Sequence, residues 1–282
     1  MKRVDVSNIA AINNEPRGTN EKYWIKHKGI NKLVKFNSKL SEDLDIMEKL
    51  SEDILKTIGI ECVNVELAVD HKNGGNCCLV ESFLTSPSEI LYSIDSNWPK
   101  REGGDVNTNI QMCFGKVFTI FYKLNKISEE QLNSLIKQYV RKTFGDCLIG
   151  NSDGKLKNTG IIYNENNQKY RLTPSFDNGL AFYIYKDYLA TCHIGNQEFN
   201  TSDVINYIIE RNYHQIEDIV NNFLSFMENE YMDTIDKYKK HLTEEKYNYI
   251  INYLLMVKEQ IKGLIKAKTK SFPQPKCGKI SR

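Results

Sequence analysis

Alternating apolar and polar residues near the start of the chain predict a small α+β unit. The stretch "YWIKHKGINKLVKFN" alternates on both sides of a glycine-containing turn, as the two strands of a hairpin do. Apolar residues then recur every three or four positions from Leu44 to Ile58, which predicts a helix that Gly59 ends. The stretches "CVNVELAV" and "CCLVESFL" flank the turn "HKNGGN" and predict a second strand pair.

The pattern changes after residue 84, where apolar residues take mainly helical spacing and the polar loop "NWPKREGGDVN" interrupts them. An apolar helix is expected at about 110–124. Ser128 and Gln131 have the spacing of a capping box, which predicts the start of a helix that ends near Cys147. This part of the chain is therefore expected to be mostly helical.

A short hairpin and two long helices are predicted further along. The strands "NTGIIY" and "KYRLTPSF" flank the turn "NENNQ", whose asparagines suit a hairpin connection. Amphipathic helices follow near 202–230 and 243–268, and Thr243 is the expected N-cap of the second. With 282 residues, the chain has room for one large domain or two lobes.

Composition and charge narrow the class of protein. The chain is 40% hydrophobic and 26% charged, as ordinary globular proteins are, and its net charge of +2 predicts no direct binding to nucleic acid or to an anionic membrane. Its seven cysteines lie mostly in apolar runs without metal-finger spacing, which is typical of reduced thiols. Because the sequence also lacks a signal peptide and any uncharged apolar run of about 18 residues, we expect a cytoplasmic protein, although secretion as an effector stays open.

Candidate chemistry lies in the polar stretch "IGNSDGKLKN". Its "GNSDGK" segment is one residue too short for a phosphate-binding P-loop, and Lys155 would put a cation among the ligands of a calcium loop. What remains is Asp153 followed five positions later by Asn158, which is the spacing of the kinase catalytic loop H-R-D-x-x-x-x-N. On its own, this spacing also occurs in plain glycine-rich turns.

The order of other charged residues favours phosphoryl transfer. A kinase-type ATP site needs a strand lysine for the phosphates, a glutamate on the next helix and a second carboxylate for Mg²⁺. Lys35 in "KLVKFN", Glu48 in "DIMEKLSEDIL" and Asp177 in "LTPSFDNG" occupy these places in this order. A single strand lysine or helix glutamate usually faces solvent. The prediction of an ATP site therefore rests on the occurrence of all three residues in the required order.

These motifs resemble the HipA-like and CtkA-like bacterial serine/threonine kinases over nearly the whole chain. "LIGNSDGKLKN" is similar to the family's I-x-N-x-D-x-H-x-x-N loop, and "YRLTPSFDNG" to its L-x-P-x-[FY]-D segment. The resemblance implies a two-lobed protein-kinase-like α+β fold that uses ATP and Mg²⁺. It also implies that Asp153 is the catalytic aspartate, Asn158 and Asp177 are Mg²⁺ ligands, and Lys35 with Glu48 serves the ATP phosphates.

The resemblance extends to the lobes and to the nucleotide-covering elements. It implies a β-rich N-lobe at 1–84 and a mostly helical C-lobe at 85–268, while the local charge pattern predicts a basic, flexible tail at 269–282. "RGTNEKYW" is similar to the family's nucleotide-covering G-x-x-E-K loop, and "LVESFL" to the hinge that contacts adenine. The residues implied to bind the nucleotide are Gly18, Thr19, Asn20, Glu21, Lys22, Glu81, Ser82 and Phe83.

Two departures from the family keep other functions open. Lys155 stands where the family has a histidine, and Glu15 stands where HipA-like members have a regulatory serine. We expect an ATP- and Mg²⁺-dependent kinase that acts on a Ser or Thr of a protein substrate, as a toxin with an antitoxin partner or as an effector. The alternatives are a nucleotide-binding pseudokinase or regulatory scaffold, and transfer to a small molecule or lipid.

Overall fold

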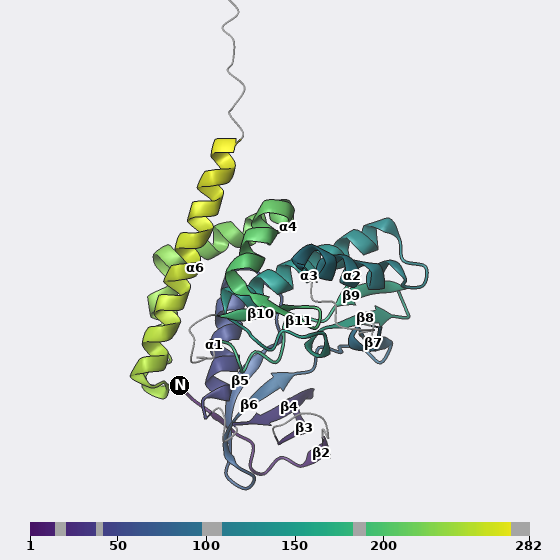
Figure 1. Cartoon of the computed structure of the whole chain (residues 1–282). Helices are drawn as coiled ribbons and strands as arrows, with labels where there is room; N and C mark the ends of the chain where they lie inside the picture. The colour runs from purple at the N-terminus through teal and green to yellow at the C-terminus, as the bar shows by residue number, and fades with distance from the viewer. Residues whose placement is uncertain (15–20, 38–41, 98–108, 183–189, 272–282) are drawn as a thin grey trace, which may run out of the picture.

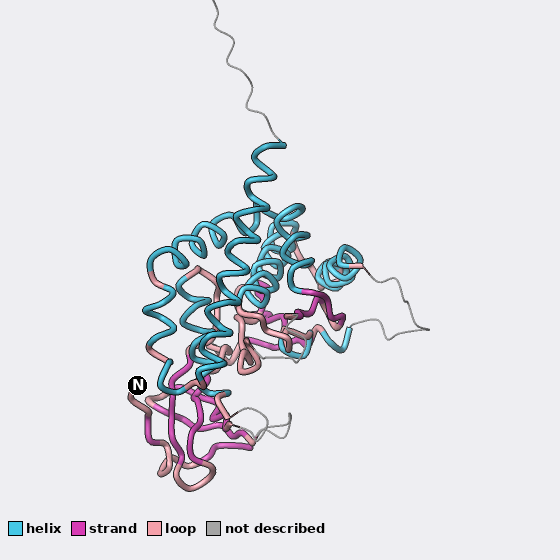
Figure 2. Tube along the Cα trace, turned by 60° about the vertical axis from the view of Figure 1, so that its left-hand side comes forward, coloured by secondary structure: helices cyan, strands magenta, loops and turns pink. Residues whose placement is uncertain are grey.

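The computed structural model describes residues 1–14, 21–37, 42–97, 109–182 and 190–271. One end of the molecule is rich in strands and the other is mostly helical, and α1 lies at the junction between them (Figures 1 and 2). Lys35 and Glu48 therefore belong to the β-rich end, whereas the stretch that contains Asp153 and Asn158 belongs to the helical end.

A six-stranded sheet forms the β-rich end, with the strand order β1-β5-β6-β4-β3-β2. The bounds are β1 (Val4–Asp5), β2 (Ala11–Asn14), β3 (Lys22–His27), β4 (Ile30–Phe36), β5 (Val65–Asp70) and β6 (Gly75–Glu81). β3 and β4 form an antiparallel hairpin, and β5 and β6 form another, so both predicted strand pairs are confirmed. The short β1 pairs with β5 in parallel.

Helix α1 (Leu44–Thr57) packs on β5 and β6 and confirms the predicted helix. Its apolar positions, among them Met47 and Leu50, are fully buried because they repeat with the helical period and so share one face. Gly59 has a φ of +85°, a left-handed conformation that glycine adopts without a steric penalty, and there the chain turns away.

The helical end consists, within the described residues, of five further α-helices. They are α2 (Ile110–Tyr122), α3 (Glu129–Leu148), α4 (Thr201–Asn229), α5 (Tyr231–Asp236) and α6 (Glu244–Ser271). Thr243 caps α6 as predicted, because its Oγ1 accepts a hydrogen bond from the backbone N–H of Lys246 at 3.2 Å. Ser128 caps α3 in the same way, but the side chain of Gln131 donates to the carbonyl of Gln168 instead of returning to Ser128, so only half of the predicted capping box forms.

Two smaller sheets complete the helical end. β8 (Gly160–Asn164) and β9 (Lys169–Leu172) form the predicted antiparallel hairpin. β7 (Glu89–Ser93), which the hydrophobic pattern did not indicate, pairs with β8 and extends this hairpin to three strands. β10 (Thr191–Ile194) and β11 (Gln197–Asn200) form a further hairpin that was likewise not predicted.

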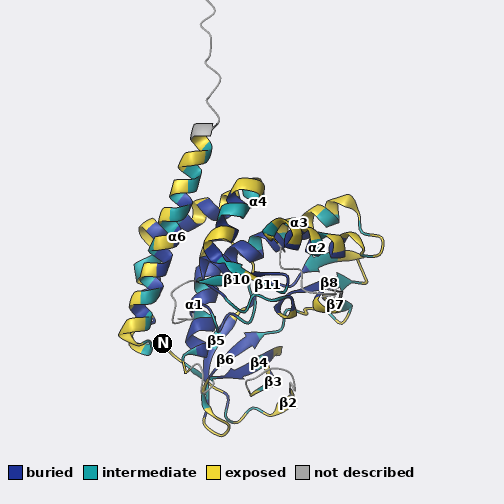
Figure 3. Ribbon diagram, viewed as in Figure 1, coloured by how far each residue is buried: buried dark blue, intermediate teal, exposed yellow. Residues whose placement is uncertain are grey.

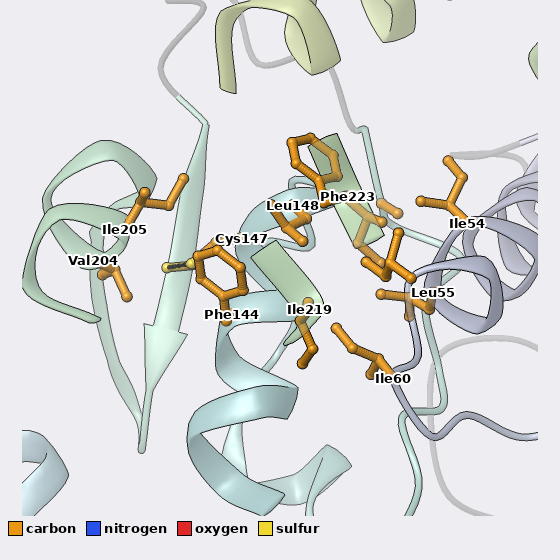
Figure 4. Close-up of a cluster of buried hydrophobic side chains, with 14 of the residues drawn as sticks. Ile54, Leu55, Ile60, Phe144, Cys147, Leu148, Val204, Ile205, Ile219 and Phe223 are labelled. Atoms are coloured by element: carbon orange, nitrogen blue, oxygen red, sulfur yellow. Dashed lines mark hydrogen bonds between the residues drawn. The ribbon is translucent and has the colours of Figure 1, made fainter. Parts of the chain in front are cut away.

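The main hydrophobic core joins α1 to the helical end. Ile54 and Leu55 of α1 meet Leu148 of α3 and Ile219 and Phe223 of α4 in one buried cluster (Figure 4). The elements around this cluster are mostly buried, whereas one side of α6 is exposed (Figure 3). Because Glu48 lies on α1, this packing fixes the position of Glu48 relative to the helical end.

The six cysteines within the described ranges are free thiols, as the sequence predicted, and Cys277 lies outside these ranges. The sulfur atoms of Cys147 and Cys192 are 3.3 Å apart in a hydrogen-bonded contact. Among the helices described above, none is long and apolar enough to span a bilayer.

Gly145 provides a test of the packing between α3 and α1. A Cβ atom at this position would lie 2.6 Å from Cδ1 of Ile60 and 3.1 Å from Cδ2 of Leu55. Gly145→Ala is therefore expected to lower the free energy of unfolding by about 1–3 kcal/mol through overpacking. Gly115→Ala on α2, where a Cβ meets no atom within 4 Å, should instead raise it by roughly 0.5–1 kcal/mol. Urea unfolding of both variants measures these changes, and a stabilising Gly145→Ala would contradict the packing described.

Candidate active site

Lys35 connects the β-rich end to the loop that follows β9. Its position on β4, opposite Cys78 of β6, places it on the sheet face that α1 covers, and it is 6% exposed. Its ammonium donates to Oε1 of Glu48 and, at 2.5 Å, to Oδ1 of Asp177. The structure thus brings together three residues that the sequence placed in one site from widely separated segments.

The charges of these three groups depend on one another. Burial by itself lowers the pKa of Lys35, but the carboxylates of Asp177 and Glu48 reverse this and hold it above its ordinary value. Burial raises the pKa of Glu48, although Lys35 opposes the rise. Lys35 lowers the pKa of Asp177, which stays ionised at neutral pH. The ammonium therefore compensates the buried charge of Glu48 and also binds Asp177, whose side chain is 38% exposed.

The backbone around Asp177 is held in an unusual conformation. Asp177 has a φ of +61°, in the left-handed region that residues other than glycine seldom occupy. The backbone N–H of the next residue, Asn178, donates to Oε2 of Glu48 at 2.9 Å. Glu48 thus binds Lys35 through one oxygen and the loop through the other, and these bonds offset the cost of the backbone conformation.

Asp153 and Asn158 form the second part of the site, between α3 and β8. A short 3₁₀ turn, Leu156–Asn158, brings the asparagine back towards the aspartate. The side-chain amide of Asn158 donates to the backbone carbonyl of Asp153 at 2.8 Å and to its Oδ2 at 3.3 Å. The ammonium of Lys157 lies 3.0 Å from Oδ2 of Asp153, and that of Lys155 lies 3.7 Å from Oδ1. The pair with kinase spacing is therefore in direct contact.

The two parts of the site adjoin one another. The side-chain amide of Asn151, two residues before Asp153, donates to Oδ1 of Asn178, the residue after Asp177, at 3.0 Å. The positive charge of Lys157, which pairs with Asp153, also contributes after Lys35 to the lowered pKa of Asp177. The sequence placed Asn151 at the first asparagine of the family's loop motif without assigning it a role, and the only signal for Asn178 was its place beside Asp177.

The oxygen atoms present suit a hard divalent cation. Asn158 uses its amide nitrogen to bind Asp153, and within the described residues no hydrogen bond reaches its amide oxygen. Asp177 binds Lys35 through Oδ1, and no described residue donates to its second carboxylate oxygen. Amide and carboxylate oxygens are the ligands that Mg²⁺ prefers, so these two residues fit the predicted metal site.

The predicted hinge lies at the end of β6. The N–H of Ser82 donates to the carbonyl of Asn31 at 3.0 Å, and the carbonyl of Phe83 accepts from Arg171 at 2.8 Å. Glu81 is the last residue of β6, and its Oε2 accepts from the side chain of Asn64 at 3.0 Å. The segment predicted to contact adenine is therefore held by hydrogen bonds to Asn31 and to Arg171.

The loop predicted to cover the nucleotide is described only in part. Gly18, Thr19 and Asn20 lie outside the described residues, as does Glu15. Lys22 is the first residue of β3 and stands opposite Lys35 in the register of the hairpin, and Glu21 precedes it. The charge of Lys22 also helps to lower the pKa of Asp177, after that of Lys35, so Lys22 belongs to the surroundings of the site.

The arrangement of a lysine strand, a glutamate helix and two polar loops between a sheet and a helical bundle defines a two-lobed protein-kinase-like fold. The model of the HipA-like C-terminal domain family matches residues 13–245, so the chain belongs to this family. No curated protein matches the sequence.

Two solved structures share the fold. The Helicobacter pylori proinflammatory kinase CtkA has a TM-score of 0.68 at 15% identity, with 96% of this chain and 100% of that chain covered. HipA from Shewanella oneidensis MR-1, a toxin–antitoxin protein solved with HipB and operator DNA, has a TM-score of 0.60 at 13% identity, with 94% and 68% covered. The predicted α+β kinase-like fold is confirmed.

Proposed function

We propose that this chain is an ATP- and Mg²⁺-dependent protein kinase that phosphorylates serine or threonine. The observation that carries the proposal is the buried ammonium of Lys35, held between Glu48 and Asp177. In protein kinases, such a lysine–glutamate pair positions the ATP phosphates, and the neighbouring aspartate holds metal. The contact between Asp153 and Asn158 supplies the remaining parts at the same site.

The apolar surface beside the hinge suits a purine base. Leu33, two residues before Lys35 on β4, packs with Phe83 and Phe176 against a small buried cluster, and all three are only partly buried. The rings of Phe83 and Phe176 lie 5.1 Å apart between centroids. We infer that adenine binds against these side chains and the hinge backbone at Glu81, Ser82 and Phe83, while its phosphates extend towards Lys35.

The acceptor hydroxyl would bind at Asp153. The carboxylate accepts the hydroxyl proton as the hydroxyl oxygen attacks the γ-phosphorus, and ADP leaves with the electron pair of the broken P–O bond. Asn158 and Asp177 would hold Mg²⁺, which neutralises negative charge on the phosphates when bound. The protein contributes mainly position and charge, since Lys35, Asn158 and Asp177 are all fixed by contacts within the site.

Removing the metal tests the proposal. With ATP and Mg²⁺ near a hundredfold excess over Kd, binding should stabilise the protein by about 2.7 kcal/mol, which raises Tm by roughly 5–10 °C at about 2–4 °C per kcal/mol. EDTA should remove most of this shift and all transfer of labelled γ-phosphate to the protein itself or to lysate proteins. Unchanged labelling in EDTA would contradict a metal-dependent kinase.

A specific contact favours a second candidate, a nucleotide-binding pseudokinase. Lys155 and Lys157 each lie beside one oxygen of Asp153, so the carboxylate faces two cations, and Lys155 stands in place of the family's histidine. A Tm shift with ATP and Mg²⁺ but no labelled product would support this candidate. Label that accumulates only in a small-molecule or lipid fraction would indicate a different acceptor.

The biological setting is proposed from the relatives alone. The structure of HipA with HipB motivates an antitoxin partner for this chain, and the description of CtkA as proinflammatory motivates an effector acting on a host. We favour a cytoplasmic site of action in the toxin–antitoxin case. A small DNA-binding protein encoded in the neighbouring gene, which copurifies with this chain, would support that case over the effector.

A further inference from the structure

We propose that Asn151 is a positioning residue that locks the catalytic loop to the metal-binding loop, with Asp146 and Lys142 of α3 as its buried support. This inference rests on the proposed kinase function and assigns tasks to residues that the function did not use. Asn151, Asp146 and Lys142 are buried, with exposures of 1%, 2% and 5%. Buried polar groups of this kind persist where their hydrogen bonds are satisfied and specify one arrangement.

Asn151 contacts the catalytic aspartate directly through the backbone. Its side-chain oxygen accepts a hydrogen bond from the N–H of Asp153 at 3.1 Å. Its side-chain nitrogen donates to Oδ1 of Asn178 at 3.0 Å, next to Asp177. One amide group therefore sets the distance between the loop of the acceptor-binding aspartate and the loop of the metal-binding aspartate.

Asp146 holds Asn151 in this orientation. Oδ1 of Asp146 accepts a second hydrogen bond from the side-chain nitrogen of Asn151, at 3.1 Å, and its Oδ2 accepts from the ammonium of Lys142 at 3.0 Å. Because a carboxylate only accepts, it requires the nitrogen of Asn151 on its side and so points the oxygen of Asn151 at Asp153. Lys142 balances the buried negative charge of Asp146.

The loop also fits closely around Asp146 at Gly154. A Cβ atom at this position would lie 2.8 Å from Oδ2 and 3.2 Å from Cγ of Asp146. The carboxylate thus binds the side chain of Asn151 before Asp153 and leaves no room for a side chain at position 154 after it. On the other side, the N–H of Asn178 donates to Glu48, so the connection continues to the partner of Lys35. The whole set links α3 and α1 through the two loops.

Exchanging donor and acceptor tests the proposal. In Asn151→Asp, two carboxylates face each other at positions 146 and 151 and the hydrogen bond between them is lost. We expect kcat to fall about a hundredfold, the loss typical of a misplaced reacting group, while KM for ATP stays near its wild-type value because Lys35 and the hinge are unchanged. The double variant Asp146→Asn with Asn151→Asp restores one donor and one acceptor. Its kcat should be at least tenfold higher than that of Asn151→Asp alone.

The control variant loses a hydrogen bond of similar kind away from the site. Asn222→Ala removes the side-chain donor to the carbonyl of Ile58, which is 3.2 Å away, and should change Tm without lowering kcat. Tm is measured for every variant, so loss of fold is recognised separately from loss of rate. Wild-type kcat in Asn151→Asp, or no recovery in a folded double variant, would overturn the proposed positioning role.

The same experiment separates the positioning role from the proposed function. If the wild-type protein transfers no phosphate under any condition, the result contradicts both the kinase function and the positioning role. An active wild type with an equally active Asn151→Asp keeps the kinase function and removes only the role of Asn151.

Discussion

Asp153→Asn is expected to lower the rate of phosphate transfer from labelled ATP by roughly 10²–10⁴-fold, the usual contribution of a positioned acid or base. Asparagine has nearly the same shape and can still accept from the side chain of Asn158, but it does not take up the proton of the acceptor hydroxyl. The fold should be kept, since the two lysines that lose a partner, Lys155 and Lys157, are 45% and 56% exposed.

Nucleotide binding in the same variant distinguishes catalysis from assembly of the site. The Tm shift with ATP and Mg²⁺ should match that of the wild type, because Lys35 and Asp177 are untouched. Asp5→Asn, at an aspartate on the exposed edge strand β1, is the control and should label normally. Equal labelling by wild type and Asp153→Asn would rule out the assigned role of Asp153.

The same pair of proteins identifies the substrate. Phosphopeptides that increase after expression of the wild type, but not of Asp153→Asn, are candidate products of this chain. Phosphorylated serines and threonines on proteins of the producing cell would favour a toxin, whereas labelling restricted to host-cell lysate would favour an effector. Absence of any difference in both lysates would favour the pseudokinase.

Local pattern was sufficient to predict the elements that carry the site. The β3–β4 hairpin and α1 follow from apolar periodicity and from Gly59, and these elements place Lys35 and Glu48. β7 was missed because "EILYS" has three consecutive apolar residues without alternation, all of them exposed. Its strand conformation comes from pairing with β8, an interaction between distant segments that local periodicity does not record.

The buried contacts behind the site, between Lys142, Asp146 and Asn151, could not be predicted from residue spacing. Lys142 and Asp146 lie four positions apart on α3, which ordinarily indicates an exposed helix pair. They are buried because the catalytic loop folds back over this part of α3, as the close fit at Gly154 shows. Asn151 occupies the first asparagine of the family's loop motif and Asn178 follows Asp177, but only the folded chain brings their amides together.

Lys35→Met should be the most damaging substitution for stability at alkaline pH. It leaves Glu48, whose side chain is 0% exposed, without its cation, and breaking a buried ion pair in this way costs roughly 3–5 kcal/mol. The pKa of Glu48 is already raised by burial and rises further without Lys35, so the folded variant binds a proton more tightly than the unfolded chain. Such a group stabilises the fold below its unfolded pKa and loses this contribution as pH rises through its folded pKa.

The free energy of unfolding of Lys35→Met should therefore fall further below that of the wild type as pH rises from 5 to 8. Urea unfolding in Mg²⁺-free buffer measures this difference. Asp177 does not contribute to this change, because Lys35 lowers its pKa below the ordinary value of 3.8 and the stability gained from that shift is fully present at both pH 5 and pH 8.

Lys32 is the matched control for this prediction. It lies on the same strand, is 4% exposed and pairs at 2.5 Å with Glu66, but the side chain of Glu66 is 38% exposed and stays solvated when its partner is removed. Lys32→Met should cost less than about 1 kcal/mol on this account. If both variants lose similar stability, or if the deficit of Lys35→Met is the same at pH 5 and pH 8, then the burial of a methylene chain matters more at Lys35 than its charge. Lys35 would in that case hold the two lobes together by packing, and its ion pairs with Glu48 and Asp177 would serve the nucleotide alone.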